Sequence, residues 1–238
     1  MTFPVQTIAN KKYQFNNILV SDILEIAKIP QNRNEQQIKH ILATILGGSD
    51  DVDALTAQER YAIYLSYLNL VDNSLDESIV IADYLAQDLN NFSRERVSEN
   101  GVSVRHLGGM EAEALEIGCE YTEDWHLGAM AITIGCEYLP EIDVSASSNV
   151  GFIGKMIQNR IETLKRLSLP EFNALMRQYL SLQDQLPKLV NFVFEDGIVL
   201  EKFNGGADDA PVRFRASAAI HGYGKELLSI AIASNSTI

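Results

Sequence analysis

The chain has 238 residues, of which 46% are hydrophobic and 21% are charged, a composition typical of a folded protein with one large or two small domains. Its net charge of −13 disfavours nucleic acid as a partner, because binding to phosphate backbones requires clustered basic side chains. No apolar run approaches the roughly 18 to 20 residues of a membrane-spanning helix. We therefore expect no membrane contact, no secretory signal peptide and a protein made in the cytoplasm, where two cysteines stay as thiols.

The N-terminal segments FPVQTIA and KKYQF predict two short strands around Asn10-Lys11. A short helix follows in SDILEIAKIP, where Ser21 is the expected N-cap and Pro30 ends the helix. This part of the chain is therefore expected to be a strand pair that leads into a helix.

Two longer helices are predicted next. In NEQQIKHILATILGG, apolar residues recur at helical spacing up to Gly47-Gly48, where a left-handed residue can end the helix. In LTAQERYAIYLSYLNLV, Thr56 and Glu59 have the spacing of a capping box, in which each side chain satisfies a free backbone amide. We expect the apolar face of this second helix to contain Tyr61, Tyr64, Leu65 and Leu68.

The middle of the chain predicts a hairpin followed by two helices. Residues 93–107 alternate in polarity around Asn100-Gly101, a dipeptide that suits a two-residue hairpin turn. GGMEAEALEI and DWHLGAMAITI are then rich in strong helix formers.

The sequence IGCEY occurs twice, at the end of each of these helical segments. The simpler interpretation is that Gly118 and Gly135 end the helices and that each neighbouring cysteine packs into the core. A zinc site is the alternative, with Cys119, His126, Cys136 and His106 as ligands. The 17-position separation of the cysteines disfavours it, because structural zinc sites usually use closely spaced ligand pairs. We predict no metal and no redox disulfide.

The small-residue segment DVSASSN predicts a boundary between an N-terminal α+β lobe, residues 1–143, and a second region, residues 150–238, although one domain is also possible. The second region begins with GFIGKMIQNRIETLKRL and a helix opened by Ser168 and Pro170 and followed by Pro187. A short loop between these helices predicts an antiparallel pair. Phe172, Met176 and Tyr179 either fill the protein's own core or form an interface with a partner.

KLVNFVFEDGIVLEKF predicts a second hairpin, around Glu195-Asp196-Gly197. The residues from 211 to 238 are expected to add two strands, or a strand and a helix. Gly222 and Gly224 do not form a phosphate loop, and His221 has no matched nucleophile. The acidic pairs Asp50-Asp51 and Asp208-Asp209 are expected to be solvated surface.

No catalytic motif is present in the sequence: there is no nucleophile elbow, phosphate loop, His-Glu-x-x-His or calcium loop. We therefore predict no enzymatic activity, no catalytic residues and no cofactor. An enzyme with distant carboxylates that meet in space, or a metal-dependent one, is the alternative from another class.

Five segments carry a resemblance to a known family. Tyr13-Gln14-Phe15, ILVSDILEIAKIP with NEQQIKHILATIL, and LTAQERYAIYLSYL resemble the N-terminal region of tail and baseplate structural proteins of long-tailed bacteriophages. LSLPEFNALMRQYLSLQ followed by apolar strands is similar to their later part. The Cys-x-x-Cys zinc element of some baseplate-hub relatives does not occur in this chain.

This resemblance implies a virion component that is assembled in the host cytoplasm and bound to other tail or baseplate proteins in a symmetric complex. We expect an α+β protein of mixed helices and β-hairpins, with a central-to-C-terminal antiparallel helix pair. It would act as a non-enzymatic structural subunit and form a homo-oligomer. A tail assembly chaperone that is absent from the mature virion is the alternative within the same class.

Overall fold

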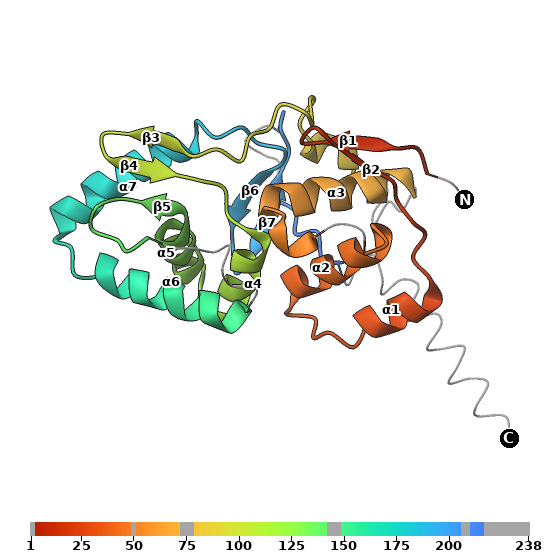
Figure 1. The fold of residues 1–238 in the computed structure, drawn as a ribbon, viewed down its shortest axis with the longest axis horizontal. Helices are drawn as coiled ribbons and strands as arrows, with labels where there is room; N and C mark the ends of the chain where they lie inside the picture. Colours follow the sequence, from red (N-terminus) through yellow and green to blue (C-terminus); the bar gives the residue numbers. More distant parts are fainter. Residues whose placement is uncertain (1–2, 49–50, 72–78, 142–148, 206–209, 217–238) are drawn as a thin grey trace, which may run out of the picture.

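The computed structural model describes residues 3–48, 51–71, 79–141, 149–205 and 210–216 and confirms the predicted α+β class. In Figure 1 the molecule is elongated, with α1, α2, α3 and the strands β1 and β2 towards one end. Helices α5, α6 and α7 and strands β3, β4 and β5 lie towards the other end, and α4 lies between the two groups (Figure 1).

The predicted N-terminal strand pair is present as β1 (Gln6–Ile8) and β2 (Lys11–Tyr13), which pair antiparallel. Its turn residues are Ala9 and Asn10, with φ angles of 52° and 62°, so the turn lies one position earlier than expected. Helix α1 (Val20–Ile26) follows, but Ser21 is not its N-cap. Instead, Leu19 precedes the helix and its amide donates to the Asp22 carboxylate at 2.8 Å.

Helix α2 (Asn34–Ile45) ends as predicted at Gly47 and Gly48, whose φ angles are 66° and 67°. Helix α3 (Ala57–Leu70) begins with the predicted Thr56–Glu59 capping box. All residues of α3 from Ala57 to Leu68 are buried, so it has no single apolar face. The reason is its central position, because α2, α4, β1 and two short 3-10 helices, η1 (Val52–Ala54) and η2 (Ile81–Tyr84), pack around it.

The predicted hairpin at 93–107 forms β3 (Val97–Glu99) and β4 (Val102–Val104), with Asn100 and Gly101 at positive φ. Helices α4 (Gly109–Gly118) and α5 (Thr122–Thr133) follow. The prediction for Gly135 is wrong, because α5 already ends at Thr133 and Gly135 belongs to strand β5 (Ile134–Gly135). This strand pairs with β4, and a Cβ on Gly135 would lie only 2.6 Å from the Ser103 hydroxyl oxygen.

Both helices predicted after residue 149 are present, as α6 (Val150–Leu164) and α7 (Leu169–Gln183). Ser168 and Glu171 form a capping box at the start of α7. The expected packing of these two helices against one another needs correction. Helix α6 packs mainly on α4 and α5, whereas α7 packs on β3 and β4 (Figure 1).

The second predicted hairpin is present as β6 (Asn191–Phe194) and β7 (Ile198–Glu201), with the turn at Asp196-Gly197. Val212 forms an isolated bridge to Leu200. Residues 143–148 of the expected linker, the pair Asp208-Asp209, Asp50 and the elements expected from 217 onward lie outside the described residues. Asn149, the last residue of that linker, is the N-cap of α6.

The core is one cluster of buried apolar side chains that draws on elements before and after residue 143. It contains Ile38 of α2, Leu115 of α4 and Ile157 of α6, for example. The packing of α6 on α4 therefore crosses the predicted domain boundary. Whether the two regions fold as separate domains stays a prediction.

Candidate functional site

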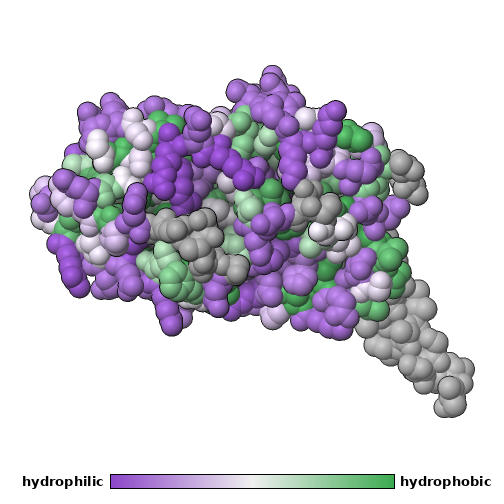
Figure 2. Space-filling model, in the orientation of Figure 1, coloured by the Kyte–Doolittle hydropathy of each residue, from purple (hydrophilic) through white to green (hydrophobic). Residues whose placement is uncertain are grey.

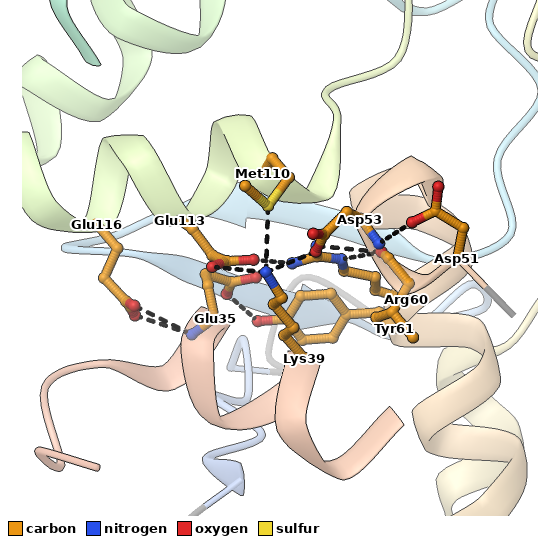
Figure 3. Close-up of polar contacts among 10 residues, drawn as sticks. Glu35, Lys39, Asp51, Asp53, Arg60, Tyr61, Met110, Glu113 and Glu116 are labelled. Atoms are coloured by element: carbon orange, nitrogen blue, oxygen red, sulfur yellow. Dashed lines mark hydrogen bonds and ion pairs between the residues drawn. The ribbon is translucent and has the colours of Figure 1, made fainter. Parts of the chain in front are cut away.

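A buried network of charged side chains joins α2, α3, α4 and η1, and we call it the buried charge network (Figure 3). Its members are Glu35, Lys39, Asp53, Arg60, Tyr61, Glu113 and Glu116. These groups are separated by up to 81 positions in the sequence, and only the packing of the helices brings them together.

Arg60 lies at the centre of this network and its side chain is fully buried. Its Nη1 donates to Glu113 at 2.6 Å, while Nε and Nη2 donate to the Val52 carbonyl at 3.3 and 3.1 Å. A buried charge needs a partner and hydrogen bonds of this kind, because transfer out of water costs several kcal/mol per ion. The backbone of Gly109 passes directly over the guanidinium, and a Cβ at that position would lie 1.9 Å from Arg60 Nε. Only glycine fits there without moving Arg60.

Lys39 adds a second cation beside this pair. Its Nζ lies 2.5 Å from Asp53 Oδ1 and 3.9 Å from Glu113 Oε2, and it also contacts the Met110 sulfur at 3.4 Å. Two cations and two carboxylates are thus held between α2, α3, α4 and η1. Their charges balance, which makes the burial of Arg60 and Glu113 tolerable, while the side chains of Lys39 and Asp53 remain 27% and 37% exposed.

Two further carboxyl groups meet at the N-terminus of α2. The Tyr61 hydroxyl donates to Glu35 Oε1 at 2.7 Å, and the Glu35 amide donates to the two Glu116 carboxylate oxygens at 3.0 and 3.2 Å. Glu116 of α4 thereby caps α2 from another helix. Burial raises the pKa of Glu35 to about 7. Burial, and then the charge of Glu35, raise the pKa of Glu116 to about 8.

Carboxyl groups with a pKa near neutrality can exchange protons at physiological pH, as a general acid or base must. Such a group must also reach a substrate. Glu35 is only 1% exposed, and Arg60, Lys39, Glu113 and Asp53 have partners within the protein. The buried charge network is therefore better explained as a set of contacts that hold α2, α3, α4 and η1 together than as a catalytic centre.

The cysteines and histidines weighed as zinc ligands do not come together. Within the part of the chain that the structure describes, no group of three His, Cys, Asp or Glu side chains is placed to hold a metal ion. His106 is buried beside Phe92, at 4.7 Å between ring centroids, and burial lowers its pKa to about 4. His126 contacts Phe194 instead. Cys119 and Cys136 are free thiols packed against the core, as the simpler interpretation predicts.

The apolar residues of α7 fall into two strips along the helix. Leu175, Tyr179 and Leu182 are buried, so the interpretation of Tyr179 as an interface residue is wrong and it belongs to the core. The second strip, which we call the α7 strip, follows a spacing of three or four residues and consists of Leu169, Phe172, Met176 and Leu180.

The α7 strip is only partly covered by the protein. Phe172 and Met176 are half-buried against the core, whereas Leu169 and Leu180 are 72% and 50% exposed. On the face shown in Figure 2, hydrophilic side chains predominate and hydrophobic ones form separate patches. Because single exposed apolar residues are ordinary, the alignment of four on one helix is the informative feature.

Sequence reasoning missed the buried charge network completely. One signal was available in the segment RYAIYLSYL, where Arg60 follows the capping box and is the only charged residue. A charge in such an apolar helix indicates a buried arginine, which requires a partner. Its partner could not be chosen from the sequence, because the chain offers 32 Asp and Glu residues.

No match was found when the chain was compared with protein-family models, with curated proteins and with solved structures. Among the described residues, no helix is both long and apolar enough to cross a membrane.

Proposed function

We propose that this chain is a non-enzymatic structural subunit of a bacteriophage tail or baseplate, which works through protein–protein contacts in a symmetric assembly. Its partners would be other tail or baseplate proteins and further copies of the chain. The resemblance of the segments from Tyr13 onward motivates the phage assignment. The α7 strip is the structural observation that supports a function by contact.

The α7 strip has the chemistry of an interface rather than of a water-facing helix side. Interface centres are enriched in aromatic residues and methionine and depleted of charge, as in Phe172 and Met176. Leu169 and Leu180 extend the same line on either side and remain accessible. A neighbouring subunit that covers this line would remove apolar area from water, at roughly 25 cal/mol per Å² before the costs of association.

Mass spectrometry of purified virions tests the assignment directly. We expect the chain in the particle at several copies, beside other tail proteins. Its absence from particles, together with its presence in infected cells, would overturn the proposal in favour of the tail assembly chaperone.

Surface substitutions test the contact itself. Leu169→Asp and Leu180→Lys place each charge at the end of α7 whose helix dipole favours it, so the fold should be retained. Ile117→Lys is the matched control, because Ile117 is 57% exposed and lies near the end of α4. We expect the α7 double variant, but not the control, to lose oligomerisation by light scattering and incorporation into particles. Equal behaviour of both variants, with unchanged circular dichroism, would exclude the α7 strip as the contact.

A further inference from the structure

A cavity of about 260 Å³ opens between the end of α5, strands β4 and β5, and α6. Three arginines line it: Arg96 before β3, Arg105 after β4, and Arg160 on α6. Ser103, Gly135 and Cys136 form part of its wall. In a protein with a net charge of −13, three guanidinium groups around one cavity are unexpected unless they have a role there.

Arg160 is buried, with only 3% of its surface exposed. Its guanidinium donates to the backbone carbonyls of Ala131, Ile134 and Pro140. Two of these carbonyls lie at the C-terminal end of α5, where the helix dipole favours a cation. Among the described residues, however, Arg160 forms no ion pair with a carboxylate. Its charge is hydrogen-bonded but not neutralised, and two of its five N–H groups remain for another acceptor.

The other two arginines differ from one another in whether their charge is paired. Arg105 donates twice to Glu111, at 2.8 and 2.6 Å, and also to the Ile132 carbonyl at 2.9 Å, so its charge is already paired. Arg96 is exposed and forms no ion pair within the described part of the chain. Glu141 is the one carboxylate among the residues that line the cavity. Three arginines therefore line the cavity with one carboxylate, and Arg105 is paired with Glu111, which is not part of the lining.

Gly135 lets the donors approach the cavity wall. A Cβ on this residue would lie 2.6 Å from the Ser103 hydroxyl oxygen and 3.1 Å from Arg96 Nη1. The Arg96 guanidinium and the Ser103 hydroxyl thus both lie close to the Cα atom of Gly135. Burial, and to a smaller extent the charges of Arg105 and Arg96, lower the pKa of Arg160 to about 10, which leaves Arg160 protonated at pH 7.

We propose that this cavity binds an oxyanion group, either a phosphate or a carboxylate, through Arg96, Arg160 and Ser103. Guanidinium groups match the geometry of both anions, and hydrogen bonds between ionised groups are stronger than neutral ones. The bound anion would supply the negative charge that Arg160 lacks. The cavity is several times larger than the ~30 Å³ that a water molecule occupies in the liquid, so the anion can be part of a larger molecule. The site does not depend on the tail function.

Binding can be measured with inorganic phosphate and with acetate, by thermal unfolding and isothermal titration calorimetry at constant ionic strength against chloride. We expect a saturable rise in melting temperature with at least one of the two anions. Arg96→Ala should weaken this binding at least tenfold without unfolding the protein, because Arg96 is exposed and unpaired among the described residues. Arg177→Ala is the matched control, since Arg177 is an exposed arginine on α7 outside the cavity wall.

Cys136 provides a local readout, because it lines the cavity. In a Cys119→Ser background, saturating anion should slow alkylation of Cys136 by neutral iodoacetamide several-fold, and Arg96→Ala should abolish the protection. Protection by phosphate alone or acetate alone supports the site and identifies the group. If neither anion binds saturably, or if Arg96→Ala and Arg177→Ala behave alike, the proposal is wrong.

Discussion

Arg60 and Glu113 form an ion pair of 2.6 Å from which water is nearly excluded, since their side chains are 0% and 6% exposed. The pair ties α3, the central helix, to α4. Buried pairs of this kind add little net stability compared with apolar residues of similar size, but they make the loss of one partner costly. This asymmetry leads to the first prediction.

Replacing Arg60 alone by Met should destabilise the protein by about 3 to 5 kcal/mol, because Glu113 would lose its 2.6 Å ion pair and keep only Lys39, 3.9 Å away, as a cation. The double replacement Arg60→Met with Glu113→Leu should recover part of this loss. Urea denaturation followed by circular dichroism measures both free energies of unfolding. If the double variant is as unstable as the sum of the two single ones, the residues are not coupled and the assigned pair is wrong.

The carboxyl pair Glu35 and Glu116 predicts a specific dependence of stability on pH. Both pKa values are raised in the folded state, to about 7 and about 8, from an ordinary value of 4.5. Folding therefore favours the protonated forms, and stability contributed by these groups is present at low pH and is lost as pH rises from about 4.5 to 8.

Glu35→Gln removes one of these titrations while keeping an oxygen to accept from Tyr61. We expect the variant to be more stable than the parent at pH 8, by on the order of 1 to 3 kcal/mol, and similar to it near pH 5. Thermal or urea unfolding across this pH range measures the difference. Glu25→Gln, on the exposed surface of α1, is the control and should leave the profile unchanged. If the free energy of unfolding changes between pH 5 and pH 8 by the same amount in the parent and in Glu35→Gln, this account is wrong.

The hairpin turn at Asn100-Gly101 predicts a cost for a β-branched residue. Gly101 has a φ of +78°, and no atom lies within 4 Å of the position that a Cβ would occupy, so Gly101→Val is opposed by backbone strain and not by a clash. We expect a loss of roughly 1 kcal/mol or more. Gly154→Ala is the contrasting control, because Gly154 is inside α6 with equal space and no positive φ, and should stabilise by up to about 1 kcal/mol. Equal melting temperatures for both variants would refute the role of the turn.

The cysteines predict tolerance of their removal. Cys119→Ser with Cys136→Ser should leave the circular dichroism spectrum and assembly intact, with a modest loss of packing, since both thiols are only partly buried. Elemental analysis of the purified parent should find no stoichiometric zinc. If the parent contains about one zinc per chain and the double variant contains none, the cysteines bind the metal and this prediction is wrong.

Features set by neighbouring residues were the predictable ones. The Thr56–Glu59 capping box, the start of α7 at Ser168 and the turns at Asn100-Gly101 and Asp196-Gly197 depend on groups a few positions apart, and all of them are present. The prediction for Gly135 failed because pairing with β4 determines its strand, and β4 lies some thirty positions earlier. Two local predictions also failed, since Ser21 is not the N-cap of α1 and the first turn lies at Ala9-Asn10.

The sequence by itself thus determined the α+β class, the order of most helices and hairpins, and the capping of α3 and α7, because these follow from local backbone chemistry and apolar periodicity. Only the tertiary structure decided which faces are covered and which charges meet. Arg60 and Glu113 are 53 positions apart, and Glu35 and Glu116 are 81 apart. Local patterns do not encode such distant pairs, since many arginines and carboxylates are interchangeable until the packing of α2, α3, α4 and α6 brings particular ones together and removes water from around them.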